Sequence, residues 1–119
     1  MTDYHLSEME ACFAELIWEA EPVRSGKLVE LCREKLNWAK PTTYTVLRKL
    51  CQKELFVKEG GTVRALLSRE EYAAVKSDQF VKKYYQGSLP AFLAAFASRR
   101  ELSEEEAAEL RRMLNDCGK

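Results

Sequence analysis

The sequence predicts a mainly α fold with a small β component, in the α+β class, and two observations predict it. Apolar residues recur at three- and four-residue steps in six stretches, as one face of a helix requires. Between the third and fourth stretches, a Gly60-Gly61 pair separates two short β-prone runs, which is typical of a hairpin. The chain has 119 residues, 46% of them hydrophobic and 32% charged, which suits one small module with a helical extension.

The first two helices are marked by their caps. Ser7 and Glu10 form a capping box that opens the first helix. Its apolar positions are Met9, Cys12, Phe13, Leu16, Ile17 and Ala20. Pro22 ends this helix, and Val23-Arg24 is expected to form a very short strand. Ser25 is expected to cap the second helix. The residues expected to face inward from it are Leu28, Leu31, Cys32 and Leu36.

The third helix and the hairpin complete a recognisable order of elements. Pro41 suits the first helical position, where its missing N–H has no partner to lose. The inner stripe of this helix consists of Val46, Leu47, Leu50 and Cys51. On the strand after Gly60-Gly61, the residues that alternate with Arg64 and Leu66 are Val63, Ala65 and Leu67. Three helices followed by a hairpin is the order of a winged helix-turn-helix, in which the hairpin is the wing.

Three more helices are expected behind the wing. Ser68 with Glu71 forms a second capping box, and Gly87 ends the helix that follows. The helical positions between them are Tyr72, Val75, Gln79, Phe80 and Tyr84. Ser88 is expected to cap the next short helix. Ser103 with Glu106 caps the last one, whose apolar positions are Ala107, Leu110, Met113 and Leu114, with Gly118 just past its end.

The charge of the chain sums to zero but is unevenly distributed. Residues 1–34 carry three basic and eight acidic side chains, whereas residues 35–69 carry eight basic and only two acidic ones. A local basic segment in a neutral chain is the electrostatic footprint of a polyanionic partner such as DNA. A solvated face with incidental lysines is the alternative, and charge alone does not decide between them.

The outward faces of the third helix supply candidates for DNA contact. They carry Thr42, Thr43, Thr45, Arg48, Lys49 and Gln52. The first turns of a recognition helix meet base edges in the major groove, where threonine suits thymine and arginine or lysine suits guanine. Residues expected to contact flanking phosphates are Lys40, Lys49, Lys53, Lys58 and Arg64. Tyr44 either packs under the wing or offers its hydroxyl to phosphate, and Thr62 with Arg64 provides the contacts of the wing.

The C-terminal helices carry more large apolar groups than three short helices can bury. The residues expected to form a dimer interface are Phe80, Val81, Tyr84, Tyr85, Leu89, Phe92, Leu93, Phe96, Leu110, Met113 and Leu114. Without a partner they would leave a large exposed apolar patch, unless they fold back onto their own winged helix. The expected domains are therefore a winged helix-turn-helix DNA-binding domain at 1–68 and a helical dimerisation domain at 69–119.

Several segments resemble the penicillinase-repressor family, also called the BlaI/MecI/CopY type. They are "LSEMEACFAELIWE", "WAKPTTYTVLRKLCQKELFVKEG", "FVKKYYQGSLPAFLAAF" and "ELSEEEAAELRRML", in the family's order and spacing. In that family a tryptophan precedes the recognition helix, as Trp38 does here. The resemblance implies a homodimeric transcriptional repressor on a palindromic operator, with the C-terminal helices making the dimer.

The resemblance also bears on how the repressor is released. Members that control β-lactam resistance are cleaved before a phenylalanine in the second dimerisation helix, and the matching bond is Ala95-Phe96. This chain departs from the pattern because the family has asparagine where Ala95 stands. A membrane sensor protease is the implied partner. The tail "RRMLNDCGK" lacks the cysteine-rich motif of the copper-responsive branch, and the wing is shorter than usual and lacks the typical aromatic residue.

Other classes of function find little support in the residues. The four cysteines form no CxxC pair and His5 is the only histidine, so neither a metal site nor a cofactor is expected. No nucleophile–base pair is visible, so an enzyme is not expected. A winged helix that docks a protein instead of DNA is the alternative. No apolar run approaches a membrane span and no secretory signal is visible, so we expect a cytoplasmic protein without membrane insertion.

Overall fold

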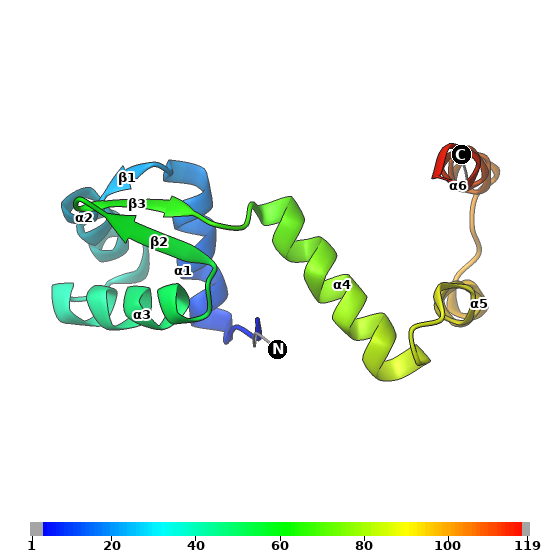
Figure 1. Ribbon diagram of the computed structural model, residues 1–119, viewed down its shortest axis with the longest axis horizontal. Helices are drawn as coiled ribbons and strands as arrows, with labels where there is room; N and C mark the ends of the chain where they lie inside the picture. Colours follow the sequence, from blue (N-terminus) through cyan, green and yellow to red (C-terminus); the bar gives the residue numbers. More distant parts are fainter. Residues whose placement is uncertain (1–3, 118–119) are drawn as a thin grey trace. The chain divides into compact units, whose positions relative to one another are not determined.

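The computed structural model describes residues 4–117, which divide into two compact units with the boundary between Ser77 and Asp78. The first unit contains α1 (Glu8–Ala20), β1 (Val23–Arg24), α2 (Ser25–Leu36), α3 (Lys40–Gln52), β2 (Phe56–Glu59), β3 (Thr62–Ala65) and the start of α4 (Arg69–Tyr85) (Figure 1). The second contains the rest of α4, α5 (Leu89–Arg99) and α6 (Glu104–Cys117). This order confirms the predicted winged-helix fold with further helices behind it. Gly118 lies outside the described residues.

The helix starts follow the predicted caps, with one exception. The Ser7 hydroxyl accepts from the Glu10 amide at 3.2 Å, and the Glu10 carboxylate accepts from the Ser7 amide at 2.8 Å. The same reciprocal pairs occur at Ser68–Glu71 and Ser103–Glu106. The prediction for Ser25 is wrong: α2 begins at Ser25, and Arg24 holds the cap position without a side-chain bond. The Ser25 amide donates instead to the Gly61 carbonyl at 2.9 Å, so the backbone there still pairs with the wing.

The core of the first unit lies between the helices and a three-stranded antiparallel sheet of order β1-β3-β2. Its largest buried side chains are Phe13, Phe56, Ile17, Leu28, Leu50, Leu55 and Val63. The predicted inward positions Met9 and Cys12 are exposed, Met9 at 48%. They lie at the edge of the α1 face because its buried side centres on Phe13, Ala14 and Ile17.

The start of α4 belongs to the winged-helix unit. A guanidinium nitrogen of Arg69 lies 2.7 Å from the carboxylate of Glu15 on α1. The hydroxyl of Tyr72 donates to the Tyr4 carbonyl at 2.7 Å, and the two tyrosine rings meet edge to face. The compact unit therefore continues past residue 68, where the sequence pattern places the end of the first domain, to Ser77.

The second unit has no buried residue among those that the structure describes. Its aromatic rings instead form a chain of contacts at the surface. Ring centroids lie 4.8 Å apart for Phe80 and Tyr84, 5.6 Å for Tyr85 and Phe92, and 6.2 Å for Phe92 and Phe96. These rings remain partly or largely exposed to solvent, so the second unit lacks a core of its own.

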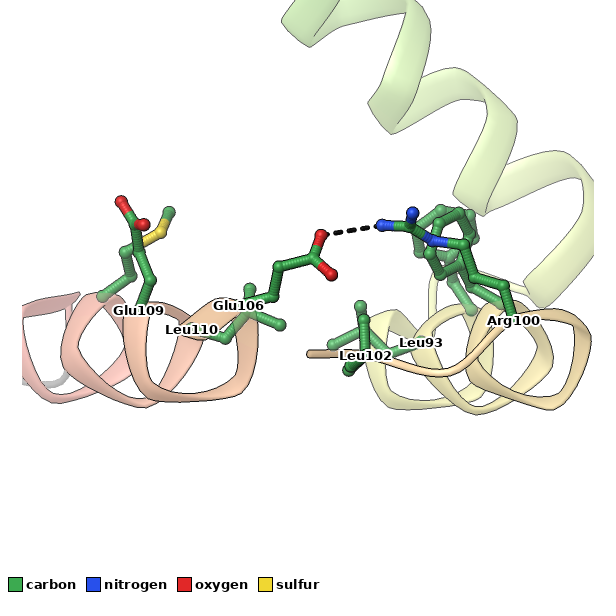
Figure 2. Close-up of a pocket in the computed structure, with 9 residues that line it drawn as sticks. Leu93, Arg100, Leu102, Glu106, Glu109 and Leu110 are labelled. Atoms are coloured by element: carbon green, nitrogen blue, oxygen red, sulfur yellow. Dashed lines mark hydrogen bonds and ion pairs between the residues drawn. The ribbon is translucent and has the colours of Figure 1, made fainter. Parts of the chain in front are cut away.

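An apolar groove separates α5 from α6. Its volume is about 380 Å³, and leucines from both helices and from the segment between them line it. Figure 2 shows Arg100 extending toward Glu106 across the gap, with 2.7 Å between the guanidinium and carboxylate atoms. The two helices are thus joined by an exposed ion pair and do not close over a shared apolar interior.

Candidate DNA interface

The outward side of α3 is a continuous polar stripe. Thr42, Thr45, Lys49 and Gln52 are exposed at three- and four-residue steps, and Arg48 lies beside them. The Thr45 hydroxyl donates to the Pro41 carbonyl at 2.9 Å, so its oxygen can still accept a hydrogen bond from a ligand. No side chain caps the helix start, so its first N–H groups stay available to an anion. The stripe offers a hydroxyl, methyl, amide and cationic surface on one rigid helix.

Thr43 does not belong to this stripe, and its predicted outward position is wrong. Its side chain is 1% exposed, and its hydroxyl donates to the Ala39 carbonyl at 3.3 Å. Burial raises the pKa of the neighbouring Cys32 thiol, and a hydrogen bond with the Thr43 side chain lowers it by a smaller amount. Thr43 precedes Leu47 by four residues and Leu50 by seven, so it lies on the inner face. That spacing was the signal available in the sequence.

The wing contacts α3 through Tyr44. The ammonium of Lys58 on β2 lies 4.9 Å from the centre of the Tyr44 ring, so this tyrosine packs against the wing. The two residues, with Leu47, Arg48 and Cys51, line a hollow of about 300 Å³. Burial raises the pKa of the Cys51 thiol, which the charge of Lys58 partly offsets. The wing therefore lies beside the second and third turns of α3.

Lys53 was predicted to contact phosphate but is engaged within the protein. Its ammonium donates to the His5 carbonyl and lies 3.9 Å from the Glu10 carboxylate. The pKa of Glu10 is lowered, chiefly by its hydrogen bond to the Ser7 amide and further by the charge of Lys53. Lys53 thus joins the end of α3 to the start of α1, and we leave it out of the candidate interface.

An arginine outside the wing contacts it, and the sequence pattern did not single this residue out as part of a site. Arg64 was predicted as a contact, and its guanidinium pairs with Glu59 at 2.8 Å. Arg24 lies in register with Thr62, and donates through Nη1 to the Gly60 carbonyl at 3.2 Å and to the Thr62 hydroxyl at 3.3 Å. Arg24 is far from the wing in sequence, so its contact with the wing becomes visible only through the pairing of β1 with β3.

The predicted dimerisation residues all lie on the surface of their own chain. Phe80, Tyr84, Leu89, Phe96, Met113 and Leu114 are between 42% and 58% exposed. Val81, Tyr85, Phe92, Leu93 and Leu110 are half-buried. Ala95 and Phe96, the candidate cleavage bond, lie within the helical span of α5, where the Phe96 carbonyl accepts from the Arg100 amide at 3.3 Å.

Between residues 4 and 117 no cluster of three or more His, Cys, Asp or Glu side chains is placed to hold a metal ion. Among the helices that the structure describes, none combines the length and apolar character that a bilayer crossing needs.

The fold, the polar stripe of α3 and the adjacent wing define a winged helix-turn-helix protein of the DNA-binding class. A sequence model of the penicillinase repressor family matches residues 6–116, and the chain belongs to that family. The family consists of DNA-binding transcriptional repressors and not of enzymes.

Relatives align over nearly the whole chain. The methicillin resistance regulatory protein MecI of Staphylococcus aureus (strain Mu50 / ATCC 700699) is 26% identical over 116 residues, covering 94% of each chain. The penicillinase repressor of Bacillus licheniformis is 25% identical over 115 residues, covering 93% of this chain and 90% of its own. The penicillinase repressor of Staphylococcus aureus is 26% identical over 108 residues, covering 87% and 86%.

Proposed function

We propose that the chain is a homodimeric transcriptional repressor that binds a palindromic operator, one winged helix to each half-site. The observation that supports it best is the outward stripe of α3, in a chain that belongs to a family of DNA-binding repressors. From Lys40 to Gln52 this helix contains no acidic residue, so no charge on it repels phosphate. Because the target is genomic DNA, we place the protein in the cytoplasm.

The residues divide into two roles. Thr42 and Thr45 face base edges in the major groove, together with Arg48, which is suited to guanine. The cations that contact the flanking backbone are Lys40, Lys49, Lys58 and Arg64, with Thr62 on the wing. Tyr44 packs against the wing, and its ring positions the ammonium of Lys58. Phosphate contacts set orientation, and the stripe sets sequence preference.

The apolar surface of the second unit supports the dimer. A helical unit without a buried residue gains stability only if a partner covers its aromatic and aliphatic groups. A second copy supplies an identical surface, which a twofold interface makes self-complementary. A twofold dimer then presents two copies of α3 to successive turns of DNA, roughly 34–36 Å apart or a multiple of that.

Selection from a pool of random duplexes tests this function. We expect the recovered sites to contain an inverted repeat whose half-site centres are about 10–10.5 base pairs apart or a multiple of that. Affinity for the recovered site should fall log-linearly with salt, because each neutralised phosphate releases counterions. Recovery of unrelated sequences without a repeat would contradict the proposal.

A protein-docking role for the winged helix is the competing function. A docking surface needs no polyanion, so the protein would shift no duplex even in dilute buffer. Electrophoretic shifts at low ionic strength therefore separate the two functions. A duplex shift that weakens steeply with added salt supports the repressor.

Release of the operator by proteolysis is the regulatory part of the proposal. The Ala95-Phe96 bond lies in α5, whose residues are exposed or half-buried, so a membrane sensor protease needs to unwind only local helix to reach it. Cleavage there would separate α6 from the rest of the second unit and weaken the dimer. Mass spectrometry on induced cells should detect a fragment ending at Ala95. An intact chain throughout induction would exclude this route.

A further inference from the structure

The tip of the wing has no side chains of its own. Gly60 and Gly61 form the turn between β2 and β3, with φ angles of 58° and 77° that favour glycine. A Cβ placed on Gly61 would lie 3.4 Å from Nη2 of Arg24. The guanidinium of Arg24 therefore lies against the bare turn and supplies the functional group that the turn lacks.

Arg24 is held in place through only part of its hydrogen-bonding capacity. Its Nη1 donates to the Gly60 carbonyl and to the Thr62 hydroxyl, which fixes the plane of the guanidinium. A guanidinium carries five N–H donors, so the donors of Nε and Nη2 remain for a ligand. Between residues 4 and 117 no carboxylate forms an ion pair with Arg24, whereas Arg64 on the same sheet is paired with Glu59.

The wing runs beside α3, and its tip lies toward the start of that helix. Lys58, two residues before the tip, lies over the Tyr44 ring in the first half of α3. The wing thus follows the recognition helix toward the end where Thr42 and Thr45 are exposed. When a helix occupies the major groove of B-DNA, the next groove across the phosphate strand is the minor groove.

We infer that Arg24 adds to the sequence preference by entering the minor groove that flanks each half-site and favouring A·T pairs there. In that groove A·T pairs present only acceptors, whereas G·C pairs add the guanine amino donor. A guanidinium has only donors, so it fits the A·T pattern and meets the guanine amino group unfavourably. Narrow A·T grooves also concentrate negative potential. The inference rests on the proposed function, since it assigns a role within the same complex.

Inosine substitution in the operator isolates this contact. Inosine–cytosine pairs present the major groove of G·C but lack the amino group in the minor groove. Beginning with a selected operator, the flanking pairs are replaced one at a time by A·T, G·C or I·C, and affinity is measured by fluorescence anisotropy. At one flanking position we expect A·T and I·C to bind alike and G·C to bind about fivefold more weakly or worse.

Variants of the protein connect this preference to Arg24. Arg24→Ala should bind the A·T and I·C operators about fivefold more weakly and treat all three flanks alike. Lys27→Ala is the matched control, because Lys27 is an exposed cation on α2 that pairs with Glu30 at 3.6 Å. It should keep the wild-type ratios. Thermal melting verifies that each variant is folded.

The outcomes separate the two proposals. If the wild-type chain shifts no duplex, the repressor function itself fails. If it binds the operator but treats A·T, I·C and G·C flanks alike at every position, only the role of Arg24 is overturned. The same holds if Arg24→Ala keeps the wild-type flank preference. The inosine measurement uses the wild-type chain, so it stands even if Arg24→Ala does not fold.

Discussion

The two units of this chain use their large apolar residues in opposite ways. In the winged helix, Phe13, Phe56 and Leu50 are between 0% and 1% exposed and pack into one core. In the second unit, Phe80 and Phe96 are 47% and 42% exposed, and no described residue is buried. The first unit is therefore built to be stable within one chain. The second lacks a core of its own and, as we propose, is completed by another copy, so its stability should depend on protein concentration.

A matched pair of phenylalanine truncations should show the largest effect. Phe13→Ala should lower the free energy of unfolding by about 3–5 kcal/mol, because it empties a buried site beside Trp38. Phe96→Ala should leave the winged helix folded and act chiefly on the second unit. Urea denaturation followed by tryptophan fluorescence measures the stability of the winged helix in each variant, since Trp18 and Trp38 lie in the first unit. Equal losses of winged-helix stability would remove the distinction between the units.

Charge on the exposed apolar surface of α6 should dissociate the dimer. Leu114→Asp places a carboxylate where the side chain is 58% exposed in the single chain and, as we propose, covered by the partner. Sedimentation equilibrium should show a shift toward the single-chain mass. Met9→Asp is the control, since Met9 is 48% exposed on α1 in the first unit and should leave the association unchanged. Dissociation by Met9→Asp alone would place the interface elsewhere.

Two threonines on α3 should separate stability from DNA sequence preference. Thr45→Ala should lose about 1–3 kcal/mol of discrimination at one operator position, because Thr45 is exposed on the stripe. Thr43→Ala should instead lower the free energy of unfolding by roughly 1 kcal/mol, because its hydroxyl is buried, and leave the preference unchanged. Anisotropy on single-base operator variants and urea denaturation provide the two readouts. Loss of preference in Thr43→Ala would restore the sequence-based assignment of that residue.

The smallest expected effect is the pH dependence of the α1 cap. The pKa of Glu10 is lowered from its ordinary value of 4.5 in the folded state, first by its bond to the Ser7 amide. A lowered folded pKa means that the carboxylate stabilises the winged helix above pH 4.5 and loses this effect as the pH falls through the lowered value. Glu10→Gln should cost about 0.5–1 kcal/mol at neutral pH and progressively less in acid. A difference between wild type and variant that does not shrink in acid would contradict this origin.

Features that depend on neighbours in the sequence could be predicted from it. The capping pairs at Ser7, Ser68 and Ser103 each span three residues, and all three form as expected. The Gly60-Gly61 turn likewise carries its own conformational requirement. Such signals fix where helices and hairpins begin and end, which is why the order of elements followed from the sequence.

Features that depend on distant pairing could not be predicted in the same way. Lys53 was predicted to contact phosphate, but its ammonium donates to a carbonyl 48 positions away in the sequence. Arg24 reaches the wing only because β1 pairs with β3, across 38 positions to Thr62. The helical periodicity did indicate that Thr43 lies on the inner face of α3, but its polar side chain suggested a solvent-exposed position. Its hydroxyl can be buried because it donates to a carbonyl of the same helix.

The bond between Lys53 and the carbonyl of His5 has a consequence for how this segment tolerates change. Every amino acid carries a main-chain carbonyl, so a substitution at position 5 leaves the acceptor intact. A deletion between Tyr4 and Ser7 would instead shift the acceptor relative to the ammonium and to the capping box behind it. Across orthologues, position 5 should therefore vary in residue type, while the segment keeps a fixed number of residues.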